Sequence, residues 1–415
     1  MKLAIGLLIL WAVLVLLSRS VWAEDRMKRA AAAAQLGDFA TAQALSAGPL
    51  AKSDPRALLI AACGALQRAK PAEVTLYLNK LERARPDAPE LAVLKILAAQ
   101  GDGGPVFRWL DPVVAAIATA KLGQPAPTIF NEPISTSKPL DPKQLASATG
   151  NGGFLLRLGA SGDVPSDALV AEAVELSKAK LQPAVAIAVI TVLTNPKLPE
   201  AKRAATLEAA RELLRRTAEQ YPDKLYLAMW SVLLGTNPSE PLTPSELDAL
   251  DKAAAAPDTA MPLPELFDEL ERAYGRVAGA TAYERAWNAT FKLFPLDLHV
   301  VLLRRVKATA ARGDAAAAAR AARVLAVLGR AFVAQRSLVE LNIGHGLLSA
   351  AFELSHDAAI EAESMKAKAE VAQLQRRAAT LRFIASLPLA GLTREVIVAN
   401  AHGELALLAS LPDVN

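Results

Sequence analysis

The residues best suited to bind a metal or to transfer protons are scarce in this chain. Its histidines and its single cysteine are His299, His345, His356, His402 and Cys63. Paired histidines one helical turn apart, or cysteines at Cys-x-x-Cys spacing, would indicate a metal or haem site, and neither pattern occurs. A set of His345, His356, Asp357 and Glu361 is the nearest alternative, but nothing in the spacing requires these side chains to meet. We therefore expect no metal and no cofactor, and histidines that are solvated or lie at helix ends.

Nucleophile and phosphate-binding motifs are missing as well. Ser161 lies within Leu158–Asp163, which lacks the spacing of a nucleophile elbow and follows no predicted strand. The glycines of Asn151–Phe154 are not followed by Gly-Lys-Ser/Thr, so we expect a turn that leads into a helix. Carboxylates are distributed evenly, and no pair stands out for acid and base catalysis. The sequence thus predicts a protein that is not an enzyme.

The composition indicates a packed protein. Hydrophobic residues make up 53% of the 415 residues and charged residues 21%, with a mean hydropathy of +0.24. This is too apolar for a disordered chain. Lys and Arg number 46 against 42 Asp and Glu, and we interpret the net charge of +4 as a small excess spread along the chain. A nucleic-acid partner is therefore not expected.

The first 23 residues have the pattern of an export signal. Residues 3–17 are uncharged and almost all aliphatic, and as a helix they would span about 22 Å, less than the roughly 30 Å of a bilayer core. Val21 and Ala23 fit a signal-peptidase site, so we expect cleavage after Ala23 and a periplasmic or secreted protein. The positive charge of Arg19 and Arg26 after the apolar run favours two alternatives. One is an uncleaved inner-membrane anchor, and the other is an inverted topology that faces the cytoplasm.

The remaining chain is expected to be all-α. Alanine is abundant, aromatic residues make up 5%, and apolar residues recur three and four positions apart. Helices are predicted at residues 24–36, 56–68, 71–83 and 87–101, which gives a period close to 34 residues. Gly37-Asp38 forms a predicted turn, and Asp54 is the predicted N-cap of a helix that has Pro55 in its first turn. Cys63 lies within this pattern and is expected to be a small core residue.

These motifs resemble the tetratricopeptide repeat (TPR). The match consists of Gly37–Ala42, which forms the Gly-Asp-aromatic turn, of Pro55 and Pro86 near the closing-proline positions, and of a later Gly313-Asp314. It covers residues 24–122 and 297–330. The resemblance implies a helical-hairpin repeat array, an α-solenoid, that binds another protein or a peptide and carries no catalytic residues.

One pair of groove residues follows from this resemblance. Aligning Gly313-Asp314 with the repeat turn places Arg304 and Lys307 on the first helix of the unit, where groove residues of the family lie. They would offer cations to an acidic peptide or a carboxylate. The alternative is that both are only solvated surface residues.

Proline-rich segments suggest further divisions of the chain. We expect a signal or anchor at 1–23, TPR-like helices at 24–122, a Pro/Gly-rich connector at 123–164, a helical block at 165–235, a Pro-rich interruption at 236–264, helical repeats at 265–355, and a long amphipathic helix with a capping helix at 356–415. The prolines of 123–153 are expected to exclude helix there. Within 236–264 a short helix at 244–255 is predicted, with Thr243 as N-cap and Glu246 completing a capping box.

Two helix faces leave alternatives open. The aromatic residues at 283, 287, 291 and 294 share one face, which predicts packing against the next repeat, with ligand stacking as the alternative. Residues 357–387 carry a heptad-like seam, consisting of Ile360, Ser364, Ala367, Val371, Leu374, Ala378, Leu381 and Ala385. We expect a packed amphipathic helix, and the alternative is a homo-oligomer formed through a coiled coil of 357–387.

Taken together, these patterns predict a non-enzymatic, exported or membrane-anchored helical repeat scaffold. It would mediate protein–protein interaction in a bacterial-type cell envelope, and it would touch the membrane only through residues 1–23 if these are not cleaved. The alternative is an envelope enzyme or carbohydrate-binding protein built on an α-solenoid.

Overall fold

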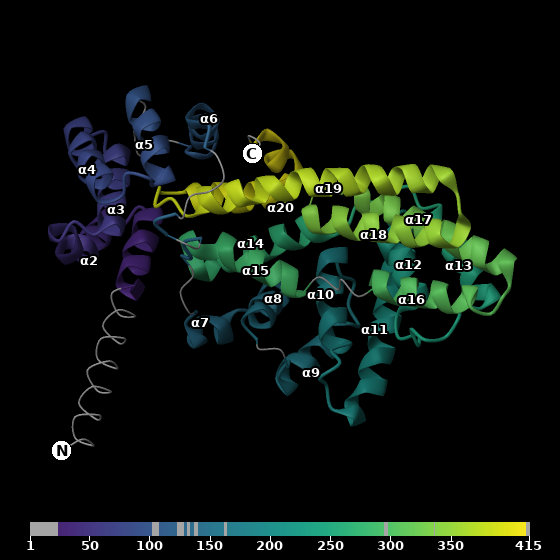
Figure 1. Cartoon of the computed structure of the whole chain (residues 1–415). Coiled ribbons are helices and arrows are strands. Elements are labelled where there is room, and N and C mark those ends of the chain that lie inside the picture. The colour runs from purple at the N-terminus through teal and green to yellow at the C-terminus, as the bar shows by residue number, and fades with distance from the viewer. Residues whose placement is uncertain are drawn as a thin grey trace, which may run out of the picture. The chain divides into compact units, whose positions relative to one another are not determined.

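The computed structural model describes residues 24–411, apart from 102–107, 123–127, 131–132, 137–139, 162–163, 294–297 and 336, and apart from the side chains of 280, 291–293 and 298. The predicted signal or anchor at 1–23 lies outside this range. The chain divides into two compact units (Figure 1). The first comprises residues 1–137, 376–399 and 407–415, and the second comprises 138–375 and 400–406. The described residues form helices, and the extended pairing among them is an isolated bridge between Lys224 and Asp258.

The first unit begins as a series of antiparallel helices. Residues 24–35 are helical, and they are followed by α2 (Phe39–Ala51), α3 (Pro55–Gln67), α4 (Pro71–Ala84), α5 (Pro89–Gln100) and α6 (Leu110–Ala120). Each of α2 to α6 packs against the next one along the chain. Pro55 and Pro89 stand in the first turn of α3 and α5, 34 residues apart. The predicted period is confirmed, although α5 begins at Pro89 and not at Asp87.

The predicted repeat turns have one common geometry. Gly37 adopts a left-handed φ of 76°, and the Asp38 carboxylate then accepts a hydrogen bond of 3.1 Å from the Thr41 amide. Gly313 has a φ of 79° and precedes Asp314, whose carboxylate accepts from the Ala317 amide at 3.0 Å. Glycine reaches this conformation without steric cost, and the aspartate satisfies an amide that the helix leaves unpaired. The two Gly-Asp signatures therefore do the same local work.

The first unit is completed by residues from near the end of the chain. The amide of Gln35 donates to the carbonyl oxygen of Leu387 at 2.9 Å, and its backbone oxygen accepts from the Gly391 amide at 3.0 Å. Gln67 accepts from the Ala390 amide at 2.6 Å. Leu387 and Leu389 are fully buried between these polar contacts. Side-chain amides thus satisfy the backbone of an irregular segment that has no helix of its own.

The second unit contains helices in successive pairs. They are α7 (Pro142–Ser147), α8 (Gly150–Ala160), α9 (Asp167–Leu176), α10 (Pro183–Leu193), α11 (Glu200–Gln220), α12 (Leu225–Leu233), α13 (Pro244–Ala254), α14 (Leu263–Ala278), the 3₁₀ turn η1 (Gly279–Thr281), α15 (Ala282–Leu293), α16 (Leu298–Ala310), α17 (Ala315–Val333) and α18 (Leu338–Ser355). Consecutive helices pack together, and α8 also packs on α14 and α15, and α13 on α17. In a strict solenoid each repeat contacts only its neighbours, so this unit is more closed than a simple array.

Two expectations about the proline-rich segments had different outcomes. The capping box is confirmed, because Thr243 and Glu246 exchange both hydrogen bonds at the start of α13. The expected exclusion of helix from 123–153 is wrong, because α7 and the first turn of α8 lie there. Pro142 occupies the first turn of α7 after the N-cap Asp141, where its missing N–H costs nothing. Gly153 lies in α8 because a Cβ there would meet the Ala148 carbonyl oxygen at 2.3 Å.

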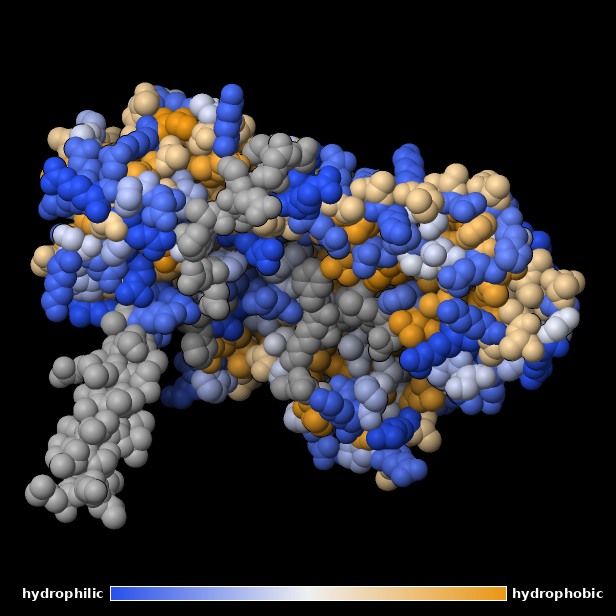
Figure 2. Space-filling model, viewed as in Figure 1, coloured by the Kyte–Doolittle hydropathy of each residue, from blue (hydrophilic) through white to orange (hydrophobic). Residues whose placement is uncertain are grey.

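The long polar helix is confirmed as α19 (Ala358–Ala385), and α20 (Leu392–Ser410) follows it. All seam positions except Ala378 are buried within the single chain, as the packed-helix interpretation predicts. On the visible face of the molecule, hydrophobic residues are interspersed with hydrophilic ones (Figure 2). Among the described helices, none is both long and apolar enough to cross a membrane.

Candidate functional site

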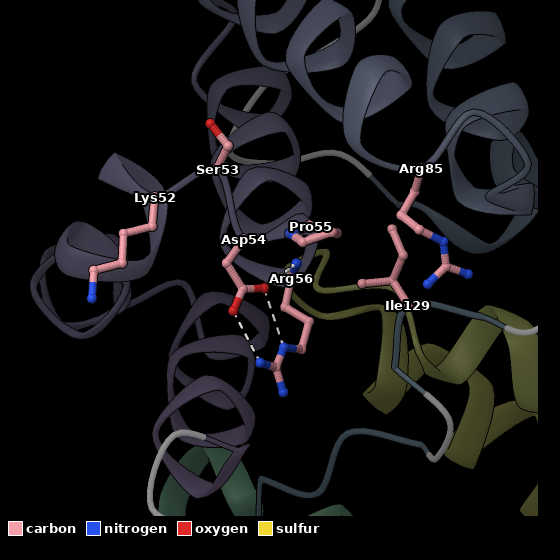
Figure 3. A pocket seen from close by; sticks show the side chains of 7 residues that line it. All are labelled: Lys52, Ser53, Asp54, Pro55, Arg56, Arg85 and Ile129. Atoms are coloured by element: carbon pink, nitrogen blue, oxygen red, sulfur yellow. Dashed lines mark hydrogen bonds and ion pairs between the residues drawn. The ribbon is translucent and has the colours of Figure 1, made fainter. Parts of the chain in front are cut away.

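An open pocket of about 540 Å³ lies in the first unit (Figure 3). It is lined by the turn between α2 and α3, by the residue that ends α4, and by one residue of the segment that follows α6. These lining residues are Lys52, Ser53, Asp54, Pro55, Arg56, Arg85 and Ile129. Three cations and one carboxylate therefore surround two apolar side chains, and the lining carries a net positive charge.

The carboxylate of the pocket is held by its own helix. Asp54 caps α3 by accepting a hydrogen bond of 2.9 Å from the Arg56 amide, and its two oxygens also accept from Nε and Nη2 of Arg56 at 3.2 and 2.9 Å. Burial alone would raise the pKa of the Asp54 carboxyl, but the hydrogen bonds and the positive charge of Arg56 lower it below its ordinary value. The hydrogen bond to Asp54 in turn raises the pKa of Arg56. Both groups are therefore charged, and their side chains are fixed relative to each other.

The other cations belong to two different helix ends. Lys52 is the C-cap of α2, and Arg85 is the C-cap of α4. Arg85 forms an ion pair with Asp87 at 3.4 Å. In Figure 3, Ile129 lies between Arg56 and Arg85, while the Lys52 ammonium points away from the Asp54–Arg56 pair. Positive side chains near helix C-termini also interact favourably with the helix dipole, which places them here at little cost.

The floor of the pocket is rigid on the side of Ile129. Its amide donates to Glu90 Oε1 at 2.6 Å, and Glu90 is fully buried in the first turn of α5. Burial raises the pKa of the Glu90 carboxyl, although the hydrogen bond from Ile129 opposes the change. Burial and the charge of Glu90 also raise the pKa of the Cys63 thiol, which is fully enclosed. Cys63 is therefore the core residue that the sequence predicted.

The pocket is suited to binding an anion and not to covalent chemistry. Ser53 is the hydroxyl residue of the lining, and the lining contains no histidine that would act as its base. Within the described residues, no group of three or more histidine, cysteine, aspartate or glutamate side chains is arranged to hold a metal ion. His345 contacts Ser364 at 3.2 Å, and His402 contacts Asp268 at 3.1 Å, so these two histidines lie in separate settings.

The predicted groove residues lie elsewhere, on α16 of the second unit. Arg304 and Lys307 are both exposed and lie one turn apart. Neither makes an ion pair with another residue of the described chain. Their exposure agrees with a binding role and equally with simple solvation. The predicted aromatic face is described only in part: Tyr283 is buried, Trp287 packs edge-to-face on Phe267, and the side chains of 291 and 294 lie outside the described set.

The residue next to Arg304 has a structural role that sequence analysis missed. Arg305 is 2% exposed and forms a double hydrogen bond with Glu246, at 2.8 Å from each nitrogen. It also donates to the carbonyl oxygens of Glu240 and Pro241. All its donors face the loop before α13, so Arg305 joins α16 to that loop. A three-residue step between the buried positions Leu302 and Arg305 was the available signal.

The positive charge of the chain is concentrated in the hairpin of α16 and α17, and the interpretation of an evenly spread excess is wrong. Residues 298–333 contain seven Lys or Arg and one acid, Asp314, a net +6 against +4 for the whole chain. Three of these cations are paired: Arg305 with Glu246, Arg320 with Asp248 and Asp251, and Arg330 with Glu363. The exposed cations for which the described structure shows no ion pair are Arg304, Lys307, Arg312 and Arg323.

Comparison with known proteins gives no independent guide to these sites. The chain matches no protein-family model and no curated protein sequence. What is shown is an all-helical protein whose successive helices pack in pairs.

Proposed function

We propose that this protein is a non-enzymatic helical repeat scaffold of the TPR-like kind, exported to the cell envelope or anchored in its inner membrane, and that it binds an acidic segment of a partner protein. The docking surface is the set of exposed cations on the α16–α17 hairpin: Arg304, Lys307, Arg312 and Arg323. The observation that carries this proposal is the concentration of charge in 298–333 beyond what ion pairs use.

Charge complementarity is the physical reason for an acidic partner. Exposed cations that have no carboxylate nearby attract an acidic surface and raise its association rate, and this attraction weakens with salt. The hairpin itself is firmly held, because Arg305, Arg320 and Arg330 connect it to α13 and α19. The exposed cations are therefore presented from a rigid support, which lowers the entropic cost of binding.

The first unit supports the repeat scaffold and also shows where a partner has no room. Its helices follow the 34-residue period, but Gln35 and Gln67 already hold the chain's own residues 387–391. A partner peptide would have to displace fully buried leucines there. The hairpin of the second unit has no such occupant among the described residues.

A binding measurement tests the proposed surface. Protein comprising residues 24–415 is titrated into a fluorescent peptide rich in Glu and Asp, and anisotropy is read at two salt concentrations. We expect saturable binding that the double charge reversal Arg304→Glu and Lys307→Glu weakens by about tenfold or more, since each exposed charge contact contributes up to about 1 kcal/mol. The matched control reverses Lys366 and Lys368, two exposed lysines of α19, and should bind as the parent does.

Two results would contradict the proposal. One is equal loss of affinity in the α16 and α19 double variants, because binding would then depend only on net charge. The other is tighter binding of a single-stranded oligonucleotide than of the acidic peptide, which would point to nucleic acid instead.

The compartment is tested separately. Full-length protein expressed in a bacterial host is fractionated, and its intact mass is measured in the soluble envelope and membrane fractions. Loss of residues 1–23 from a soluble envelope species supports export with cleavage, and the full mass in the membrane fraction supports the anchor. A full-length protein confined to the cytosol would contradict both.

A further inference from the structure

We infer that the pocket of the first unit binds a small organic anion, with its carboxylate or phosphate between Arg56 and Arg85 and its apolar part on Pro55 and Ile129. This inference does not depend on the proposed partner surface, because the pocket lies in the other unit and uses different residues.

The charges around the pocket favour an anion. Lys52, Arg56 and Arg85 line it against one carboxylate, that of Asp54, which Arg56 already engages. Asp87 pairs with Arg85 from outside the lining, and Glu24 adds to the negative field at Arg56. A guanidinium has five N–H donors, more than one carboxylate uses, so a second anion can be shared between the two arginines.

The apolar part of the lining narrows the class of ligand. Pro55 is fixed in the first turn of α3, and Ile129 is held through its amide by Glu90. A fully hydrated inorganic ion would leave these side chains unused. A volume of about 540 Å³ is within the range of small-molecule sites. The chemistry therefore fits a compact ligand that has one charged end and one apolar end.

Calorimetric titration of the 24–415 protein provides the test. The probes are hexanoate, hexyl phosphate, inorganic phosphate and the uncharged hexanol. We expect saturable binding of at least one of the two hexyl anions, and binding of hexanol and inorganic phosphate that is about tenfold weaker or undetectable. Preference for hexanoate or for hexyl phosphate then tells whether the anionic group is a carboxylate or a phosphate.

Variants locate the binding in the pocket. Arg85→Gln should weaken the preferred probe by about tenfold, and Lys52→Gln by about threefold, since Lys52 acts from the rim. Neither residue caps a helix N-terminus, and circular dichroism checks that each variant is folded. The matched control is Lys80→Gln, an exposed lysine of α4 outside the pocket, which should bind as the parent does.

The inference is overturned if neither hexyl anion binds more tightly than hexanol, or if Lys80→Gln loses as much affinity as Arg85→Gln. Binding of inorganic phosphate as tight as that of hexyl phosphate would also overturn it, because the apolar floor would then contribute nothing. None of these outcomes affects the peptide measurement on the α16–α17 hairpin.

Discussion

Glu395 in α20 accepts a hydrogen bond of 2.9 Å from the backbone amide of Leu110, the first residue of α6. Its other carboxylate oxygen accepts from the Trp109 amide at 3.1 Å. No side chain of the N-cap residue Trp109 performs this task. The start of α6 is thus capped by a carboxylate that lies 285 residues further along the chain, and the negative charge also faces the positive end of the helix dipole.

Removal of this cap should destabilise the first unit. For Glu395→Ala we expect a loss of about 1–2 kcal/mol in the free energy of unfolding, because two helix amides lose a charged acceptor. Urea denaturation followed by circular dichroism measures it. The control is Glu353→Gln, an exposed carboxylate near the end of α18, which should change stability by less than about 0.5 kcal/mol. Equal stability of both variants would show that the distant cap contributes little.

The neighbours Arg304 and Arg305 should respond very differently to the same substitution. Arg305→Ala leaves Glu246 and two loop carbonyls without their partner, and we expect a loss of about 3–5 kcal/mol in the free energy of unfolding. Arg304→Ala changes only an exposed side chain and should fall within about 0.5 kcal/mol of the parent. Chemical denaturation of the two variants side by side measures the contrast. Similar losses would contradict the assignment of Arg305 as the residue that holds the loop.

Glu90 should make stability depend on pH. Its burial raises the pKa of the folded carboxyl above the ordinary 4.5, so the folded state binds this proton more tightly than the unfolded state. The contribution to stability is therefore full below about pH 4.5 and is lost as the pH rises through the folded pKa. Glu90→Gln keeps an acceptor for the Ile129 amide without a charge.

The measurement for Glu90 is the free energy of unfolding of both proteins between pH 4 and pH 8. We expect the variant to gain on the parent by about 1 kcal/mol or more toward pH 8, since burying an uncompensated charge is costly. A constant difference over this range would show that Glu90 does not titrate there.

Gly159 and Gly275 provide a matched pair of glycine substitutions. A Cβ at Gly159 in α8 would lie 2.0 Å from the hydroxyl of the buried Tyr274, whereas a Cβ at Gly275 in α14 meets nothing within 4 Å. Gly159→Ala should destabilise the protein by about 1–3 kcal/mol through overpacking. Gly275→Ala should stabilise it by about 0.5–1 kcal/mol, because alanine is the better helix former.

A double variant checks the cause of the Gly159 effect. Tyr274→Phe removes the hydroxyl that the new methyl group would meet, so Gly159→Ala should cost less in that background. Thermal unfolding of the four proteins gives the coupling between the two positions. Strictly additive effects would mean that the hydroxyl is not the obstacle.

The seam of α19 bears on oligomeric state. Because its seam positions from Ile360 to Ala385 are nearly all buried within one chain, we expect a monomeric mass that does not change with concentration in light scattering. The alternative of a coiled-coil dimer through 357–387 predicts a mass that doubles as concentration rises, and that would require α19 to leave its packing partners.

The local structure of this protein was largely predictable from its sequence. The Gly-Asp turns, the Asp54 cap with Pro55, the capping box of α13 and the long α19 all depend on residues within about four positions of each other. Helix caps and helix periodicity act at that range, so their signals stand in the sequence. The short helix α7 was missed because five prolines outweighed the one, Pro142, that stands at a helix start.

The candidate sites and the closure of each unit were decided only by the tertiary structure. Glu395 serves α6, Gln67 holds Ala390, and Arg305 engages Glu246, each across a long stretch of chain. The pocket likewise combines Arg56, Arg85 and Ile129 from three separate segments. A polar side chain looks the same in the sequence whether it is solvated or joined to a distant partner. Only packing, which removes water from some of these groups and not from others, makes Arg305 a structural residue and leaves Arg304 available for binding.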